Sequence, residues 1–258
     1  MSASGRPPAA TGAAGEAGLW SELAGWVPAG WHDVEPTEAA VVVLFDPAAD
    51  LTRRSSAWGH RLPDASVSSL ASFGAGLAMA EADAWEQDAP HVATRAYAER
   101  RFLLGDRLLH WAVPWLDAVG RCYPEHRGDA HRCRDLLLVL GDRLRPAPDL
   151  GAVEGMTPPG EDSFGPVAQT ASLERWLRSV WSGVVVLDAT VRSMTGGRAE
   201  LDLAGPGRTD AAMLFTVAAA RWSGLAASHP GSARLWCDLS ARAATTARLL
   251  AAGDAPPR

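Results

Sequence analysis

Three residue types are missing from the 258-residue chain, which contains no Lys, no Asn and no Ile. All 24 of its basic residues are therefore Arg. Because the codons of the missing residues are rich in A and T, the pattern indicates a very GC-rich genome, such as that of an actinobacterium. Codon supply thus explains the Arg content, and the formal net charge is −6. Since no basic surplus is present to neutralise phosphates, we expect no nucleic-acid partner.

Cysteine and long apolar runs are also scarce. The three cysteines are Cys122, Cys133 and Cys237, and an odd, sparse set suits the reduced thiols of the cytoplasm better than a disulfide framework. No apolar run reaches about 18 residues, so the sequence predicts no membrane-spanning helix. The N-terminal residues lack the apolar stretch of a secretory signal. We therefore expect a cytoplasmic protein without a membrane partner.

Apolar residues at helical spacing are abundant, and they predict the fold class. The clearest helix begins at Pro63–Ser66, where a stripe of apolar residues three or four apart follows: Val67, Leu70, Phe73, Leu77, Ala80 and Ala84. Gly74 and Gly76 weaken this helix relative to Ala. Glycines kept in a helix often let another backbone approach it closely. Further helices are expected at 91–120 with a kink at Pro114, and at 129–145, 171–181, 184–194, 209–226 and 231–252. Since no strand pair is convincing, the sequence predicts an all-α antiparallel helical bundle.

The composition divides the chain into one domain and two tails. Residues 1–18 are Gly, Ala, Pro and Ser with little else, which predicts a disordered tail. Residues 19–252 form a single helical domain, and 253–258 form a second tail. A Pro/Gly-rich loop at 146–170 separates the two helical halves of this domain.

Four metal-ligand side chains gather within 12 residues of the sequence: Cys122, His126, His131 and Cys133. All are competent zinc ligands, so a structural metal site is one interpretation. Their spacing matches no standard zinc knuckle or ribbon, and short clusters arise often by chance. We favour a helix–helix turn where polar residues collect, and expect neither a metal nor another cofactor.

A His and an Asp four residues apart suggest a second kind of chemistry. His110 lies in an apolar helix with Asp106 one turn earlier, which is the spacing of a general base and its orienting carboxylate. No Ser or Cys nucleophile is marked, and neither a phosphate-binding loop nor a strand-borne dinucleotide fingerprint is present. We favour a satisfied polar pair, with no catalytic residue, and expect that the protein is not an enzyme.

Eleven tryptophans are many for this length. Trp is enriched at recognition surfaces, but it also fills cores, and this chain lacks Ile. Both interpretations stay open. A recognition groove lined by Trp58, Phe73, Leu77, Trp111 and Trp115 would suit an apolar peptide.

Residues 57–145 resemble the TorD/DmsD/NarJ family of chaperones for molybdenum oxidoreductases. The similar stretches are Arg61–Ala65, followed by Leu70, Phe73, Leu77, Met79 and Glu81, then Leu103–Trp111 with Pro114 and Trp115, and later Trp181–Leu187. Ala65 and Arg107 stand where the family has His.

The resemblance implies a cytoplasmic assembly chaperone, a monomer or homodimer. It would bind the signal or an apolar segment of a molybdopterin oxidoreductase subunit and hold it for cofactor insertion before export or assembly. Acidic side chains such as Asp64, Glu81 and Asp106 would pair with Arg residues of this protein client. The implied client-binding residues are Trp58, Pro63, Asp64, Leu70, Phe73, Leu77, Glu81, Asp106, His110, Trp111 and Trp115. Two alternatives remain: a structural subunit of an oxidoreductase complex, and a helical metal-dependent enzyme.

Overall fold

The computed structural model describes residues 8–25, 47–146, 182–194 and 207–252. Within these ranges all regular elements are helical and no strand forms, which confirms the predicted all-α class. The α-helices are α1 (Pro8–Gly25), α3 (Pro47–Ser56), α4 (Val67–Glu86), α5 (Pro90–Leu104), α6 (His110–Cys122), α7 (Arg127–Leu144), α9 (Asp188–Met194), α10 (Gly207–Ser228) and α11 (Ala233–Ala252). The loop predicted at 146–170 lies outside the described residues except for residue 146, and the helix predicted at 171–181 and the tail at 253–258 lie outside them entirely.

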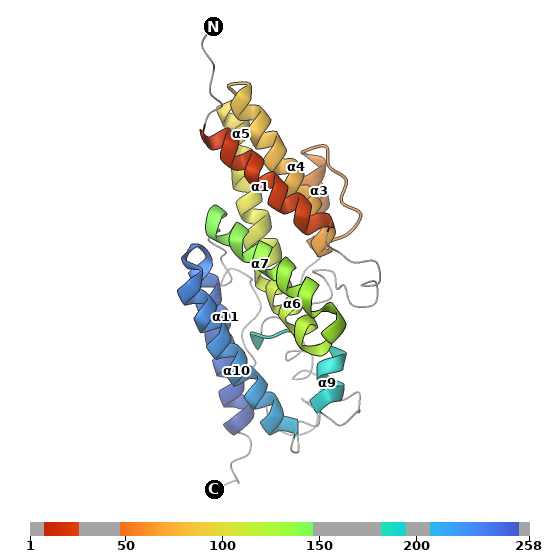
Figure 1. Ribbon diagram of the computed structural model, residues 1–258, viewed down its shortest axis with the longest axis vertical. Coiled ribbons are helices and arrows are strands. Elements are labelled where there is room, and N and C mark those ends of the chain that lie inside the picture. Colours follow the sequence, from red (N-terminus) through yellow and green to blue (C-terminus); the bar gives the residue numbers. More distant parts are fainter. Residues whose placement is uncertain (1–7, 26–46, 147–181, 195–206, 253–258) are drawn as a thin grey trace.

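The helices are arranged in two groups that meet at α6 and α7 (Figure 1). α1, α3, α4 and α5 gather at one end of the molecule, and α10 and α11 form an antiparallel hairpin at the other. Buried apolar residues from all of these helices form one continuous core. The described residues therefore belong to a single domain with one core.

The N-terminal helix α1 corrects the prediction of a disordered tail over residues 1–18 for its part from residue 8 onward, and residues 1–7 lie outside the described residues. α1 begins at Pro8, and its buried residues are Ala13, Ala17, Trp20 and Leu23. They recur at spacings of four and three, so they form one apolar face, and this face packs on α4. Ala13 and Ala17 supply the half of the stripe that falls within the predicted tail. Because Ala is both a strong helix former and a common residue of low-complexity tails, the composition concealed the pattern.

Helix α4 confirms the clearest sequence prediction. It begins after Ser66, whose hydroxyl accepts a hydrogen bond from the Ser69 backbone N–H at 3.3 Å, as an N-cap does. Gly74 permits another element to approach α4 closely, as its position in the helix suggested. The neighbour is an aromatic ring, however, and not a backbone. A Cβ added at Gly74 would lie 2.5 Å from the indole of Trp20. The absence of a side chain at Gly74 therefore allows α1 and α4 to pack closely.

The predicted helix at 91–120 is divided, but not at Pro114. A π-helical turn, Gly105–Leu109, joins α5 to α6, and α6 continues through Pro114. The indole N–H of Trp111 donates to the carbonyl of Arg107, 2.5 Å away. The change of geometry thus lies several residues before the proline. π-turns have no strong local sequence signal, so the pattern could not place this one.

The segment before α9 corrects the helix predicted at 184–194. α9 starts only at Asp188, and Val184, Val185 and Val186 are buried without helical structure. Successive β-branched residues disfavour a helix. Gly183 precedes them at φ +94°, and its carbonyl accepts a hydrogen bond from the indole of Trp222 at 2.7 Å. This buried segment therefore anchors α10 to the rest of the molecule.

A second contact fixes the turn of the α10–α11 hairpin. The short turn Pro230–Ser232 joins the two helices and packs on α7. There the Asp142 carboxylate is 2.7 Å from Nδ1 of His229 and accepts from the Gly231 backbone N–H at 3.1 Å. The hairpin is thus fastened by the face that contains Phe215, Trp222 and Trp236, all fully buried.

Candidate functional site

The predicted aromatic groove is not a surface feature of this structure. Leu70, Phe73, Leu77, Trp111 and Trp115 are each at most 1% exposed and belong to the central core. The prediction that such residues line an open groove is therefore wrong. Of the seven tryptophans among the described residues, five are fully buried, so core filling is the correct interpretation for those. The helical spacing was correctly recognised, but spacing alone does not say whether another element covers the stripe.

The acidic residue Glu81 has an internal partner. It is buried on α4 and accepts from the guanidinium of Arg100 on α5, which also binds Glu16 of α1. Arg100 is 1% exposed. These three side chains therefore form a buried ionic triad that joins three helices. The prediction that Glu81 pairs with an Arg of a client is corrected, because its charge is already neutralised inside the fold.

The remaining predicted binding residues lie near the surface. Pro63 and Asp64 are exposed, and Asp64 accepts hydrogen bonds from the Ser66 backbone and the Ser69 hydroxyl. Burial raises the pKa of Asp64, but these hydrogen bonds outweigh it and leave the pKa below its ordinary value. Trp58 is half-buried under the guanidinium of Arg95, and Asp106 is half-buried in the π-turn. Asp64 thus stabilises the start of α4 through these hydrogen bonds.

His110 is a buried titratable residue at the start of α6. It follows the π-turn directly and is 3% exposed. Burial lowers its pKa to about 4, a hydrogen bond with the Gly105 backbone opposes this shift, and the charges of Arg107 and Arg242 add to it. The ring is therefore neutral near pH 7. Since it is enclosed in the core, it has no access to a substrate in this structure, which favours a structural role over that of a general base.

We predict that His110 makes the fold sensitive to mild acid. Because its pKa is about 4 in the folded protein and about 6.5 in an unfolded chain, only the unfolded chain gains the proton between these values. Stability attributable to His110 is thus present above pH 6.5 and falls as the pH falls. Between pH 7.5 and 5, wild type should lose about 2 kcal/mol more than His110→Gln. Urea denaturation at both pH values measures this difference, and equal losses in the two proteins would contradict it.

The four candidate zinc ligands do not assemble into a site. The Cys122 thiol lies 3.1 Å from the Thr190 hydroxyl, and His126 packs against the Tyr123 ring. His131 lies against Gly120, and Cys133 is buried in the core. In the part of the chain that the structure describes, no three His, Cys, Asp or Glu side chains are placed to hold a metal. The metal interpretation therefore has no geometric support.

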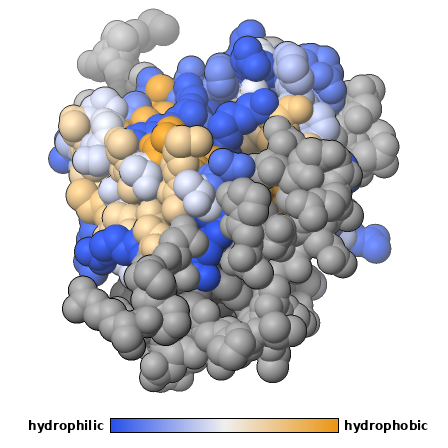
Figure 2. Space-filling view, turned by 90° about the horizontal axis from the view of Figure 1, so that it is seen from below, coloured by the Kyte–Doolittle hydropathy of each residue, from blue (hydrophilic) through white to orange (hydrophobic). Residues whose placement is uncertain are grey.

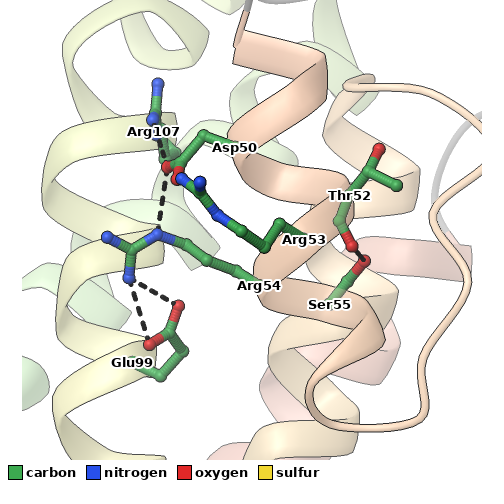
Figure 3. Close-up of polar contacts among 7 residues, drawn as sticks. All are labelled: Asp50, Thr52, Arg53, Arg54, Ser55, Glu99 and Arg107. Carbon is green, nitrogen blue, oxygen red and sulfur yellow. Dashed lines mark hydrogen bonds and ion pairs between the residues drawn. The ribbon is translucent and has the colours of Figure 1, made fainter.

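A cluster of charged residues holds α3 on the molecule (Figure 3). The Asp50 carboxylate accepts from Arg54 at 3.0 Å and from Arg107 of the π-turn at 2.9 Å, and Arg54 also reaches Glu99 of α5 at 3.0 Å. Burial raises the pKa of Asp50, but hydrogen bonds from Arg53, Arg54 and Arg107 and the charge of Arg54 lower it to about 2. A carboxylate this acidic is a poor base, so the cluster is a structural clamp.

The α10–α11 hairpin carries an open apolar groove on its outer face, with a volume of about 590 Å³. The groove lies along both helices, and its walls consist mainly of small side chains: Thr209, Ala212, Met213, Thr216 and Ala219 from α10, and Ala244, Ala247, Arg248 and Ala251 from α11. Met213 is 63% exposed, and Val217, one turn further along α10, is 61% exposed. Figure 2 shows apolar residues gathered on the side of the molecule where this hairpin lies.

Sequence reasoning missed this groove, although a signal was present. α10 buries Phe215, Ala218 and Trp222 on one face, while Met213 and Val217 occupy another. A helix that is apolar on more than one side needs a cover on more than one side. α11 and the core cover one side of α10, and the side with Met213 and Val217 stays exposed. Large exposed apolar residues that cluster in this way mark interaction surfaces more often than isolated ones do.

Comparison with known proteins provides no match: no family model, no curated protein and no solved structure is similar enough to the chain to be matched. Among the described helices, none combines the length and the apolarity that crossing a bilayer requires. The groove and the buried charges are therefore interpreted from their own geometry.

Proposed function

We propose that this protein is a cytoplasmic assembly chaperone similar to the TorD/DmsD/NarJ family, which holds an apolar segment of a molybdenum oxidoreductase subunit. The family resemblance of residues 57–145 is one support. The observation that carries the proposal is the open groove between α10 and α11, with Met213 exposed on its wall. The proposed binding site thus moves from the buried residues of α4 and α6 to the outer face of the hairpin.

The chemistry of the groove suits holding a polypeptide. Its walls are largely Ala and Thr side chains with one Met and one Arg, and they offer mostly apolar contact area. Met is flexible and polarizable, so it adapts to partners of different shape. A partner that covers Met213 and Val217 gains stability in proportion to the apolar area removed from water. The client is thus bound and later released without any bond being made or broken.

The proposal predicts that a charge placed in the groove abolishes function in the host. Met213→Glu puts a carboxylate on an exposed apolar wall, where a bound client would have to desolvate it. Met79 on α4 is 51% exposed and lies outside the groove, so Met79→Glu is the matched control. A strain without the gene should lose most of its molybdoenzyme activity. Wild type and Met79→Glu should restore it, and Met213→Glu should not.

Two outcomes of this experiment would contradict the proposal. Unchanged molybdoenzyme activity in the strain without the gene would show that the clients are not molybdenum oxidoreductases. Full rescue by Met213→Glu would show that the client does not bind in the groove. Circular dichroism of both purified variants verifies that each is folded, which the exposure of both positions leads us to expect.

A further inference from the structure

The backbone of the groove determines what form its occupant takes. Most wall residues lie inside two regular helices, where backbone N–H and C=O groups are paired along the helix; only Thr209 in the first turn of α10 and Arg248 and Ala251 near the end of α11 approach the helix termini. The Thr216 hydroxyl also donates back to its own helix, to the Ala212 carbonyl at 2.9 Å. An extended peptide would bury backbone groups that find few partners here, at a large cost in free energy. An occupant that pairs its own backbone avoids this cost, and a helix does so.

The dimensions of the groove also fit a helix. Its wall on α10 extends from Thr209 to Ala219, which corresponds to about 15 Å or three helical turns. Ala212, Ala244 and Ala247 present single methyl groups, and such small residues let a third helix approach the pair closely. Met213 would then insert between side chains of the incoming helix.

The positive charge of Arg248 on the groove wall indicates that the occupant carries a negative charge nearby. Arg248 is exposed and hydrogen-bonds the Thr245 hydroxyl at 3.1 Å, but no carboxylate within the described ranges pairs with it. Arg208, at the same end of the groove, donates to the Leu249 and Leu250 carbonyls and so tethers α10 to α11. Asp210 follows on α10 but does not line the groove. This end is therefore complementary to a carboxylate of the partner.

We propose that the α10–α11 groove binds an amphipathic α-helix of the client that has a small apolar stripe and a carboxylate opposite Arg248. The inference rests on the proposed function and makes it more specific: the bound segment is a folded, acidic-edged helix rather than an extended, Arg-rich signal. The groove would thus distinguish clients by helix formation and by charge.

The test uses three labelled 18-residue peptides and the full-length protein. The first peptide is an amphipathic helix with an Ala/Leu stripe flanked by Glu, the second has Arg in place of Glu, and the third contains two central Pro residues in the Glu background. Fluorescence anisotropy measures each affinity. Wild type should bind the Glu peptide at least tenfold more tightly than either of the others. Arg248→Glu should reverse the preference between the Glu and Arg peptides.

Arg234→Glu is the control, since Arg234 is an exposed Arg of α11 outside the groove and the change in net charge is the same. It should leave the preference intact. Equal binding of the Glu and Arg peptides, or equal effects of the two Arg variants, would overturn the charge assignment. Equal binding of the Pro peptide would overturn the helical occupant.

These failures are distinguishable from failure of the proposed function. If wild type binds all three peptides equally while Met213→Glu binds none of them, the groove still holds polypeptides. Only the inference about a helical, acidic occupant is then overturned. If wild type binds none of the three peptides, the inference is also overturned, and the rescue experiment then decides the proposed function separately.

Discussion

Replacing Arg100 by Met is expected to lower the free energy of unfolding by about 3–5 kcal/mol. The Arg100 side chain is 1% exposed and binds Glu16 of α1 and Glu81 of α4, whose side chains are 14% and 8% exposed. The substitution keeps an apolar side chain of similar length but removes the cation. Two carboxylates then remain close together in the interior without a positive partner, which is the costly way to break a buried ion pair.

The neighbouring residue provides the control for this experiment. Arg101 lies on the same helix, and its guanidinium donates to the Arg145 carbonyl at 2.7 Å near the surface. Arg101→Met should therefore cost about 1 kcal/mol or less. Urea denaturation followed by Trp fluorescence measures both values, because the buried Trp20 belongs to the region that the triad holds together. Similar losses in the two variants would show that the triad does not stabilise the packing of α1, α4 and α5.

Two glycines of α4 are expected to respond in opposite directions when Ala replaces them. A Cβ at Gly74 would lie 2.5 Å from the Trp20 ring, and this ring is fully buried. Because a rigid indole in a packed core has little room to move, Gly74→Ala should destabilise the protein by about 3 kcal/mol.

Gly76 lies two residues further along the same helix. A Cβ there would be no closer than 3.8 Å to the nearest neighbouring atom, a ring nitrogen of His60. Gly76→Ala should instead stabilise the helix by about 0.5–1 kcal/mol, since Ala loses less backbone entropy than Gly. Thermal unfolding of both variants gives the sign of each change. Two stabilising substitutions would mean that Trp20 does not pack on Gly74.

Local patterns identified most of the fold in advance. The stripe from Val67 to Ala84 predicted α4, and the ranges predicted for α7, α10 and α11 lie close to those observed. α4, α7 and α11 bury one apolar face each, so their periodicity is visible in the sequence alone. The part of α1 before residue 19 was missed because its buried residues, Ala13 and Ala17, are both Ala. Val184–Val186 was misassigned because a buried, non-helical apolar run has the same composition as a helix.

The candidate site was less predictable than the fold, for a physical reason. Phe73 and Trp111 have the residue types of a binding surface, but the structure covers them with other helices. Whether an apolar stripe is covered depends on which elements meet it in three dimensions, and a one-dimensional pattern does not contain that information. The groove at Met213 has the opposite property: its walls are mostly ordinary Ala and Thr residues, and only the packing of α10 on α11 makes them a groove.

The central claim, that the α10–α11 groove holds a client polypeptide, is tested most directly by photocrosslinking in the native host. A photoreactive benzoylphenylalanine is placed at position 213 in one full-length protein and at position 79 in another, two exposed Met positions of which only the first lines the groove. A crosslink is expected from position 213 to a molybdopterin oxidoreductase subunit, identified by mass spectrometry, within a segment of helical periodicity, and no such adduct is expected from position 79. Adducts to that subunit from both positions in equal yield, or from neither, would contradict the claim.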